Sequence, residues 1–543
     1  MSEPTFGVLR IALSLPLPRC FDYALPETLL AEESLVGRRA RVPFGSSEKI
    51  GVIESVHPHD VAQGDLKTIL EVLDPEPLFS GELLQNLRWL SRYTQAPLGE
   101  VYATAMPTLL RQGKDLPDNK IAAWDLTMLG RHQWTYLRPN TKLRKFAERL
   151  LKHPVTEDQL DLDDENWRNS ANTLKNRGYI ERVALKQETH HDKKQPGPAL
   201  NVEQKQALHA IEHQVPGFHC HLLEGVTGSG KTEVYLQAIS HCLAQGKQAL
   251  ILVPEIGLTP QTLKRFRERL GVSVYSMHSG LNDGERARAW SAMWRGQAHV
   301  LVGTRSAVFA PMPKAGLIIV DEEHDSSYKQ QDGIRYHARD FAIVRAKILG
   351  VPIILGSATP SLESLHNALA GRYQHLHLKH RAGIAKPPRV RVLDIRKRPL
   401  THGLSTDTLA AIRACMERGE QALVFKNRRG YAPVLLCHDC GWSAQCPRCD
   451  SPMSVHGAAR NLQCHHCGYR KNKPSSCPDC SSLALQPQGV GTERLEEALA
   501  EAFPDVPLLR IDSQTTRNKD GLQKKLAELG DKAGILVGTQ ILA

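Results

Sequence analysis

The spacing of hydrophobic and polar positions changes along the chain, and each change indicates a different kind of structure. From Asn201 onwards, short apolar runs end in glycine or polar turns and alternate with helical segments. The runs are HCHLLEGV, QALILVPE, AHVLVGT, GLIIVDEEH and VPIILGSAT, and a second set follows as EQALVFKN, VPLLRIDS and AGILVGTQ. Strands that alternate with helices predict parallel, doubly wound sheets. We therefore expect an α/β protein with two such lobes.

The residues before Asn201 follow other patterns. Apolar runs such as GRRARVPFG and KIGVIESV, punctuated by glycine and proline, predict a β-rich domain through residue 105. A polar stretch from about 140 to 185 reads as short helices that end in a strand, which fits either a winged helix or a small helical spacer. The composition of HHDKKQPGP indicates a linker. These changes divide the chain into four expected parts: residues 1–108, 109–195, 196–395 and 396–543.

Composition and charge are those of a globular protein with several domains. The 543 residues carry a net charge of +11, and this basic balance favours a polyanionic partner. Residues 379–398 hold 8 Lys and Arg against 1 acidic residue, which fits either a solvated linker or a nucleic-acid contact. No apolar run approaches the ~20 residues that cross a bilayer, and the N-terminus lacks the pattern of a secretory signal. We expect a cytoplasmic protein without a membrane partner.

The segment GVTGSGKT (225–232) fits the pattern G-x-x-x-x-G-K-[ST] and lies between an apolar strand and a helix. Its glycines allow successive backbone N–H groups to turn inward and cradle phosphate oxygens. Lys231 is expected to reach the β- and γ-phosphates, and the Thr232 hydroxyl to ligate Mg²⁺. The predicted ATP-binding residues are Gly225, Val226, Thr227, Gly228, Ser229, Gly230, Lys231 and Thr232.

The segment LIIVDEEHD (317–325) supplies the acidic partner of this loop. A hydrophobic strand brings Asp321 and Glu322 to its carboxyl end, where doubly wound folds bind ligands. Asp321 is expected to hold Mg²⁺, and Glu322 to orient or activate the attacking water. With Lys231, these two acids are the predicted catalytic residues, and the reaction class is phosphoryl transfer to water.

Directly after these acids, SSYKQQDGIRYHARD interleaves aromatic and cationic side chains. Tyr328 and Tyr336 alternate with Lys329, Arg335 and Arg339. Aromatic rings stack on bases and cations bind phosphates, so the segment predicts a contact with single-stranded nucleic acid. The other interpretation is that the two tyrosines pack a surface loop.

Eight of the twelve cysteines form four CxxC pairs within the 44-residue window 437–480. In a cytosolic protein such pairs are more often metal ligands than disulfides. Eight thiolates complete two closed tetrahedral zinc sites, which are structural rather than catalytic. An iron–sulfur cluster is the chemical alternative. The spacing leaves open whether the two inner pairs share one ion or neighbouring pairs combine in order.

The DEEH motif resembles the DExH box of superfamily 2 helicases, and further blocks follow in the order of that superfamily. They are PEIGLTPQ (254–261), GTRSA (303–307), GSATPS (356–361) and VGTQ (537–540). With GVTGSGKTEVY and with NRRGYAP running into CHDCGW, the chain resembles the PriA family of primosomal replication-restart helicases over essentially its whole length. The resemblance implies two RecA-like lobes, the second incomplete, a β-rich N-terminal DNA-binding domain, a winged helix and a two-zinc insertion.

The same resemblance implies an activity and a set of site residues. The family unwinds forked DNA in the 3′–5′ direction with ATP, and its partners would be single-stranded DNA, primosome proteins and single-strand-binding protein, with this chain as a monomer. Because PLPRCFDYALP and RVPFG match its DNA-binding domain, a pocket for a DNA 3′ end would include Phe21, Asp22, Gly45 and Lys67. The implied zinc pairing is nested, with one site of Cys437, Cys440, Cys477 and Cys480 and a second of Cys446, Cys449, Cys464 and Cys467.

The chain ends as VGTQILA, before the arginine-bearing block with which the family completes its ATP site. An arginine finger contributes ~10³–10⁵ in turnover. We therefore expect binding of ATP and DNA with weak hydrolysis. The alternatives are a fork-binding scaffold in which ATP acts as a switch, and an RNA helicase of the same superfamily.

Overall fold

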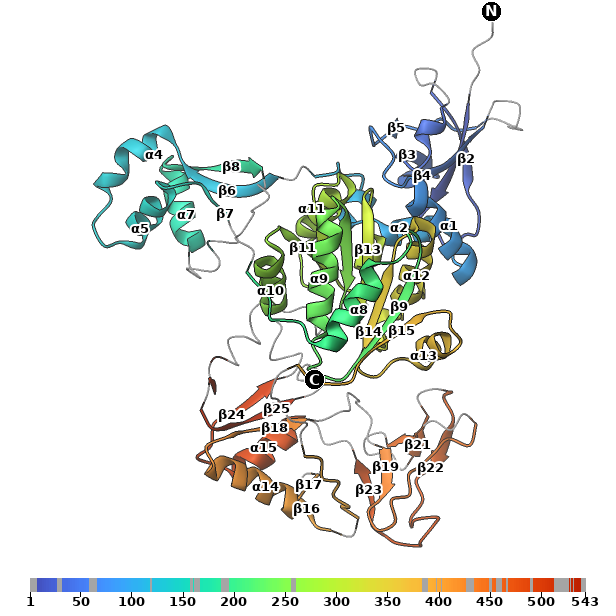
Figure 1. Ribbon diagram of the computed structural model, residues 1–543, viewed down its shortest axis with the longest axis vertical. Coiled ribbons are helices and arrows are strands. Elements are labelled where there is room, and N and C mark those ends of the chain that lie inside the picture. The colour runs from blue at the N-terminus through green and yellow to red at the C-terminus, as the bar shows by residue number, and fades with distance from the viewer. Residues whose placement is uncertain are drawn as a thin grey trace, which may run out of the picture. The chain divides into compact units, whose positions relative to one another are not determined.

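A computed structural model describes most of the chain, and the structural statements below concern the described residues. These are residues 7–26, 32–57, 66–117, 120–156, 160, 167–186, 195–254, 260–382, 389–396, 398–401, 403–425, 434–448, 452–455, 461–464, 467–488, 492–511, 527, 529–530 and 532–538. The chain divides into two compact units, Met1–Lys386 and Pro387–Ala543 (Figure 1). Each unit is described by itself.

A seven-stranded sheet forms the centre of the first unit. Every pair of neighbouring strands is parallel, and the inner strands are almost wholly buried, as a sheet covered on both faces requires. This confirms the predicted doubly wound fold. In spatial order the strands are β11 (Val274–Met277), β12 (Val300–Gly303), β10 (Gln248–Leu252), β13 (Ala315–Asp321), β14 (Ile353–Ser357), β9 (Cys220–Gly225) and β15 (Gln374–Leu378).

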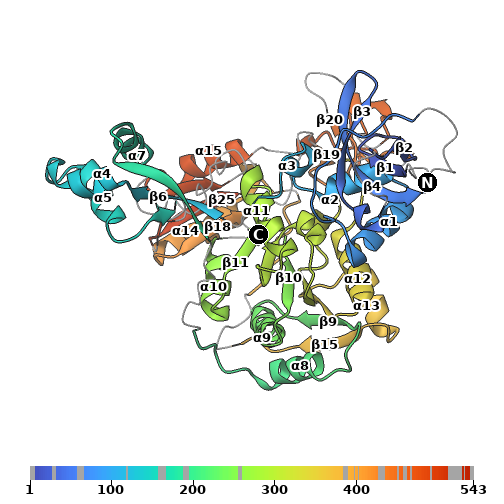
Figure 2. The ribbon, with the colours of Figure 1, turned by 90° about the horizontal axis from the view of Figure 1, so that it is seen from above.

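Helices cover both faces of this sheet (Figure 2). One face packs against α8 (Val202–Glu212), α9 (Lys231–Ala244) and α10 (Pro260–Leu270). The other packs against α11 (Asp283–Trp294), α12 (Ala338–Leu349) and α13 (Leu362–Leu369). Helix α8 begins with a capping box, in which the side chains of Asn201 and Gln204 each accept from the other residue's backbone N–H.

The N-terminal part combines an antiparallel sheet with three helices. The strands are β2 (Phe21–Ala24), β1 (Val8–Leu13), β4 (Ser47–His57), β3 (Arg39–Phe44) and β5 (Glu71–Val72) in spatial order. The helices are α1 (Gly81–Thr94), α2 (Leu98–Ala105) and α3 (Thr108–Arg111). The prediction of β structure through residue 105 is therefore wrong from residue 81. Leu83, Leu87 and Leu90 recur at helical spacing and are buried.

These N-terminal helices share one hydrophobic core with the central sheet. Phe79 and Leu87 belong to the same buried cluster as Trp290 of α11. Across this contact the guanidinium of Arg345, which is fully buried, donates to Glu82 at 2.6 Å. Because apolar packing and a buried ion pair both join them, the N-terminal helices and the central sheet form one body.

Residues 120–186 fold around a separate small core that includes Trp124, Phe146 and Trp167. Its strands form an antiparallel sheet in the order β7, β6, β8. Helices combined with an antiparallel sheet agree with the winged-helix interpretation, which stays a prediction. The elements are β6 (Lys120–Leu126), α4 (Met128–Gln133), η3 (Trp134–Tyr136), α5 (Lys142–Leu150), β7 (Val155–Thr156), α7 (Trp167–Asn176) and β8 (Ile180–Lys186).

The second unit contains a parallel three-stranded sheet with an insertion. The sheet has the order β18 (Gln421–Phe425), β25 (Gly534–Gly538), β24 (Leu508–Ile511), and it packs with α14 (Thr406–Glu417) and α15 (Thr492–Ala502). Between β18 and β24 the cysteine-rich segment forms an antiparallel sheet of its own. Its strands are β19 (Val434–Cys437), β20 (Ser454–Val455), β21 (Asn461–Gln463), β22 (Arg470–Asn472) and β23 (Leu485–Gln488).

Among the described helices, none has both the length and the apolar character that a membrane crossing requires.

Candidate nucleotide, zinc and DNA sites

The glycine-rich loop joins the carboxyl end of β9 to the first turn of α9. Gly228 and Gly230 have φ angles of 79° and 84°, a region that glycine adopts without strain. Lys231 Nζ donates to the Gly225 carbonyl at 2.9 Å and lies 3.8 Å from Glu322 Oε1. Val226, Thr227 and Gly228 are exposed, Ser229 and Gly225 are buried, and Gly230, Lys231 and Thr232 lie between these extremes. The loop and the ammonium group of Lys231 therefore lie at the carboxyl edge of the sheet.

Asp321 ends the neighbouring strand β13 and is held by two tyrosines. Tyr235 of α9 donates its hydroxyl to Asp321 Oδ1 at 2.9 Å, and Tyr328 donates to the Asp321 carbonyl at 2.7 Å. Burial, together with the charge of Glu322, raises the pKa of Asp321 to about 6. A nearby cation would stabilise the charged form of this buried carboxylate. The Asp321 carboxylate and the Thr232 hydroxyl are hard oxygen ligands of the kind that Mg²⁺ prefers.

The position of Tyr235 depends on a glycine in the neighbouring strand. A Cβ atom built on Gly356 of β14 would lie 1.6 Å from the Tyr235 hydroxyl. The glycine of the GSAT block therefore leaves the space through which Tyr235 reaches Asp321. The sequence alone did not single out Tyr235, because the hydrogen bond joins residues 86 positions apart.

The DEEH motif also contacts the GSAT block directly through His324. Glu322 has a φ angle of 44°, a left-handed conformation that costs a non-glycine residue energy. His324 Nδ1 lies 2.8 Å from Ser357 Oγ, and the same hydroxyl accepts from the Thr359 N–H at 2.9 Å. Hydrogen bonds thus connect the DEEH motif to the loop that follows β14.

Glu323 forms a second link, and its role was missed from the sequence. Its carboxylate is fully buried and accepts from Arg339 at 3.0 Å, the Ser361 N–H at 2.6 Å and the Ser364 hydroxyl at 2.8 Å. These donors lie in α12, before α13 and in α13. One carboxylate therefore holds the first turns of two helices next to the end of β13.

Gln204 is a further residue that sequence reasoning missed. After capping α8, its side-chain amide donates to the Ser229 carbonyl at 2.9 Å. Helix α8 is thereby attached to the phosphate-binding loop. The pattern N-x-x-Q at residues 201–204 is a capping signal, but nothing in it indicates the contact with the loop.

The segment after DEEH differs from its predicted role in DNA stacking. Tyr328 and Tyr336 are 0% and 2% exposed and belong to the core, and Arg339 is buried against Glu323. The prediction that these three side chains contact DNA does not agree with their burial, since stacking requires an exposed ring face. The interpretation as core tyrosines fits the structure. Arg335 is exposed, and Lys329, which is half-buried, donates to its carbonyl.

A groove of about 410 Å³ lies beside this segment, and the sequence did not predict its composition. Most of its lining side chains are polar, and three are cationic: Arg111 from α3, Arg286 from α11 and Arg305 from the GTRSA block. Asp332 and Ile334 also line it. Arg305 also donates to the carbonyls of Ser327 and Lys329 at 3.0 and 3.1 Å. Three guanidinium groups in an open groove fit the phosphates of a nucleic-acid strand.

The predicted residues of the N-terminal pocket lie at neighbouring places in that sheet. Phe21 of β2 packs edge-on against Phe44, next to Gly45 in the turn between β3 and β4, with ring centroids 5.4 Å apart. Asp22 accepts from Arg10 at 3.0 Å, and the backbone of Lys67 pairs with Ala24 of β2. The structure thus brings β2, the turn and the Lys67 segment together.

In the insertion, four thiols form one cluster. The Sγ atoms of Cys437 and Cys480 are 3.7 Å apart and those of Cys440 and Cys477 are 3.6 Å apart, and all four lie within 4.8 Å of one another. A tetrahedral zinc ion with Zn–S bonds of about 2.3 Å separates its ligands by about 3.8 Å. The four thiols therefore fit zinc, grouped as the nested pairing groups them.

The second cluster contains Cys446, Cys464 and Cys467, with 3.5 Å between the Sγ atoms of Cys446 and Cys467. The fourth predicted ligand, Cys449, lies outside the described residues. No disulfide joins any of the described cysteines. Parts of three predicted helicase blocks, residues 255–259, 426–433 and 539–540, also lie outside the described residues.

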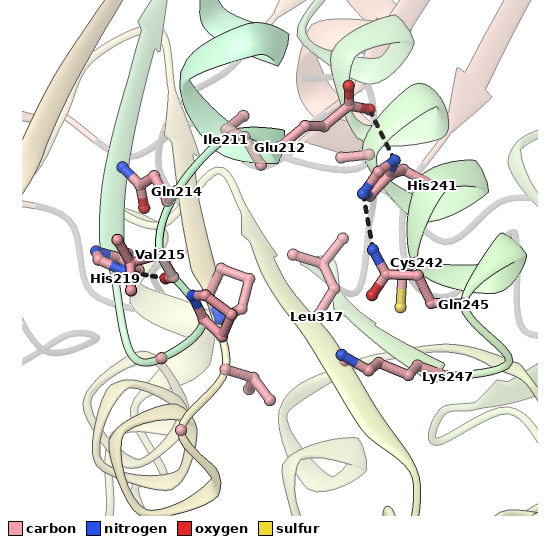
Figure 3. A pocket seen from close by; sticks show the side chains of 17 residues that line it. Ile211, Glu212, Gln214, Val215, His219, His241, Cys242, Gln245, Lys247 and Leu317 are labelled. Carbon is pink, nitrogen blue, oxygen red and sulfur yellow. Dashed lines mark hydrogen bonds and ion pairs between the residues drawn. The ribbon is translucent and has the colours of Figure 1, made fainter.

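A smaller cavity, of about 180 Å³, opens at the opposite end of the central sheet (Figure 3). Glu212 and His241 lie next to each other on one side of it, in a 3.9 Å ion pair, and Lys247 and Leu317 also line it. The cavity lies at the amino ends of β9, β13 and β14. Doubly wound folds bind ligands at the carboxyl ends of their strands, so the nucleotide site is at the other edge.

Comparisons with known proteins agree with this geometry. Residues 10–107 match the family profile of the PriA 3′ DNA-binding domain, residues 201–368 that of the DEAD/DEAH box helicases, and residues 446–471 that of the Cys-rich region of PriA DNA helicase. The matched segments contain the N-terminal sheet, the nucleotide site and the inner cysteine pairs, in that order.

Curated relatives match the chain over nearly its whole length. The replication restart protein PriA of Haemophilus influenzae is 42% identical over 99% of this chain and 74% of its own length. The proteins of the same name from Bacillus subtilis and Treponema pallidum are 35% and 34% identical, over 97% and 98% of this chain and 75% and 71% of their own lengths. The chain therefore belongs to the PriA family of replication restart proteins.

Proposed function

We propose that this ATP-dependent DNA helicase moves in the 3′–5′ direction, recognises stalled replication forks and starts primosome assembly for replication restart. The observation that carries the proposal is the apposition of Lys231 with Asp321 and Glu322 at one edge of the sheet, in the same body as the N-terminal DNA-binding domain. The names of the relatives support the role in restart. Primosome proteins and single-strand-binding protein are the proposed partners of a monomeric, cytoplasmic chain.

In the proposed mechanism, the loop amides and Lys231 bind the β- and γ-phosphates of ATP. Thr232 and Asp321 would hold Mg²⁺, which neutralises charge that develops on the phosphates. Glu322 orients the attacking water, and the Tyr235 hydroxyl fixes the Asp321 carboxylate by a hydrogen bond. The contacts His324–Ser357 and Glu323–Arg339 would couple the presence or absence of the γ-phosphate to the position of the loop after β14 and of α12.

The proposed path of single-stranded DNA is the groove of about 410 Å³ that Arg111, Arg286 and Arg305 line. These three arginines would bind phosphates. Lys329 and Arg335, in the segment that follows DEEH, are the further proposed DNA contacts. The 3′ end would enter the N-terminal pocket around Phe21, Asp22 and Gly45, with Lys67 beside it. Two zinc ions would be held by the two cysteine clusters, and the insertion would present a docking surface for DNA or a partner.

ATP hydrolysis with and without forked DNA tests this proposal. We expect forks to stimulate hydrolysis, and Lys231→Ala to reduce it by about 10²-fold or more, since it removes a charge that acts on the transferred phosphate. The matched control is Lys247→Ala, which changes an exposed lysine at the opposite end of the sheet.

The same hydrolysis assay compares DNA with RNA, and forks that have a free 3′ end with forks that lack one. Preferential stimulation by DNA forks with a free 3′ end, weakened in Asp22→Asn but not in the exposed control Glu76→Gln, supports the assignment. Fork binding without any turnover in the unchanged chain would instead support a scaffold that uses ATP as a switch. Equal stimulation by RNA would support an RNA helicase.

A further inference from the structure

Two histidines and a glutamate meet on the last two strands of the central sheet. His375 and His377 lie on β15, and Glu224 lies on β9, one residue before the phosphate-binding loop. His375 Nε2 is 2.7 Å from Glu224 Oε2, and His377 Nδ1 is 3.7 Å from the same oxygen. One donor atom of each side chain lies within 4.8 Å of the other two.

The strand register produces this cluster. His375 and His377 alternate with Leu376 and Leu378, which are buried in the core on the α8 and α9 side, so both imidazoles leave β15 on its other face. His377 is the direct cross-strand neighbour of Glu224 in the parallel pair. Since β15 is an edge strand, the cluster is open to solvent on one side.

We propose that Glu224, His375 and His377 form a binding site for a divalent transition-metal ion of the zinc class. Two imidazoles and one carboxylate are a ligand set that zinc accepts with one position left for water. Imidazole nitrogen favours such ions over Mg²⁺ or Ca²⁺, which prefer oxygen. His377 and Glu224 are 44% and 35% exposed, so an ion can enter from solvent. The site is separate from both cysteine clusters.

The position of the cluster gives the ion a structural consequence. The Val226 N–H donates to the Leu378 carbonyl at 3.2 Å, and the Ala382 N–H donates to the Gly228 carbonyl at 2.8 Å. The segment that follows the two histidines therefore supports two residues of the phosphate-binding loop. An ion shared by β9 and β15 would fasten this edge strand next to the loop, which would stabilise the first unit and restrict the loop.

The test adds Co²⁺ to the full chain after its thiolate sites have been filled with Zn²⁺. We expect one further equivalent to bind, with d–d absorption but without the thiolate charge-transfer band that a cysteine site gives. His377→Gln and Glu224→Gln should each weaken this binding by at least about 10-fold. Zn²⁺ should also raise the melting temperature of the parent chain, because a ligand of the folded state stabilises it.

The matched control is His380→Gln, which changes an exposed histidine three residues beyond His377 that pairs with Glu203. It should retain the additional equivalent and the rise in melting temperature. His377 is exposed enough for its variant to fold, and circular dichroism checks this for all variants. The proposal is overturned if the zinc-filled chain takes up no Co²⁺, or if His377→Gln and Glu224→Gln bind it as tightly as the control does.

Discussion

The guanidinium of Arg339 donates to the carboxylate of Glu323 at 3.0 Å, and the two side chains are 9% and 0% exposed. This buried pair lies next to Asp321 and Glu322, and it also reaches α13 through Ser361 and Ser364. The Glu323 carboxylate therefore joins the first turns of α12 and α13 to the end of β13.

Glu323→Gln is expected to destabilise the first unit by about 3–5 kcal/mol, because it leaves a buried guanidinium and two hydroxyl donors without their charged acceptor. Urea unfolding followed by circular dichroism measures the loss. The control Glu363→Gln makes the same change at an exposed position in the first turn of α13. Equal stability of the two variants would show that the pair does not hold these segments together.

Gly356→Ala is expected to displace Tyr235 from Asp321, since the new methyl group would occupy the position of the tyrosine hydroxyl. Overpacking of this kind costs about 1–3 kcal/mol, and nucleotide hydrolysis should fall because Asp321 loses its fixed orientation. The control is Gly284→Ala in α11, where the nearest atom to the added Cβ is 3.3 Å away. Wild-type hydrolysis by Gly356→Ala would contradict the role given to Tyr235.

The buried side chain of His221 is expected to make the stability of the first unit depend on pH. It is fully buried in β9, and burial lowers its pKa to about 4, whereas an unfolded chain has a histidine pKa of about 6.5. Between these values only the unfolded chain binds the proton. The stability present above pH about 6.5 is therefore lost as the pH falls towards about 4.

From about pH 7 to about pH 5 this loss amounts to about 2 kcal/mol. His221→Leu should remove that part of the pH dependence, while His132→Gln, at an exposed position in α4, should retain it. Urea midpoints at the two pH values decide between them. An unchanged pH dependence in His221→Leu would show that other groups cause it.

Zinc content tests the two cysteine clusters separately. We expect two zinc ions per chain, and one in either Cys437→Ser or Cys446→Ser, because each change removes one thiolate from a different cluster. The control Cys415→Ser changes an isolated, half-exposed thiol and should keep both ions. Loss of both ions from a single cysteine variant would contradict independent sites.

Chelation of the metal should unfold the insertion, whose core is small and includes Leu435, Met453 and Leu462. Amide hydrogen exchange across residues 434–488 measures this loss. The amide protection of the seven-stranded sheet and of β18 should not change, because these strands lie outside the insertion.

The parts of the candidate site whose position in the fold could be predicted from the sequence are those encoded by neighbouring residues. The loop before α9 and the acids at the end of β13 each consist of neighbouring residues, and the apolar strands before them place both at one sheet edge. Tyr235 and Gln204 could not be found in this way. Their hydrogen bonds to Asp321 and Ser229 span 86 and 25 residues, and the sequence carries no signal of that pairing.

The prediction for Tyr328 and Tyr336 failed for a different reason. An aromatic side chain that alternates with cations fits both an exposed nucleic-acid surface and a loop whose rings point inward. Burial decides between them, and it is set by contacts such as that of Tyr336 with Phe309, whose ring centroids are 4.9 Å apart. In the N-terminal part, by contrast, the helical spacing of Leu83, Leu87 and Leu90 was a local signal that could have predicted α1.

The core that α1 shares with the central sheet has a consequence for movement along DNA. The domain that binds a 3′ end is attached to the nucleotide-binding sheet by packing around Trp290 and by the Arg345–Glu82 pair. Because a packed core resists deformation, we expect a strand end captured by this domain to keep its distance from the phosphate-binding loop.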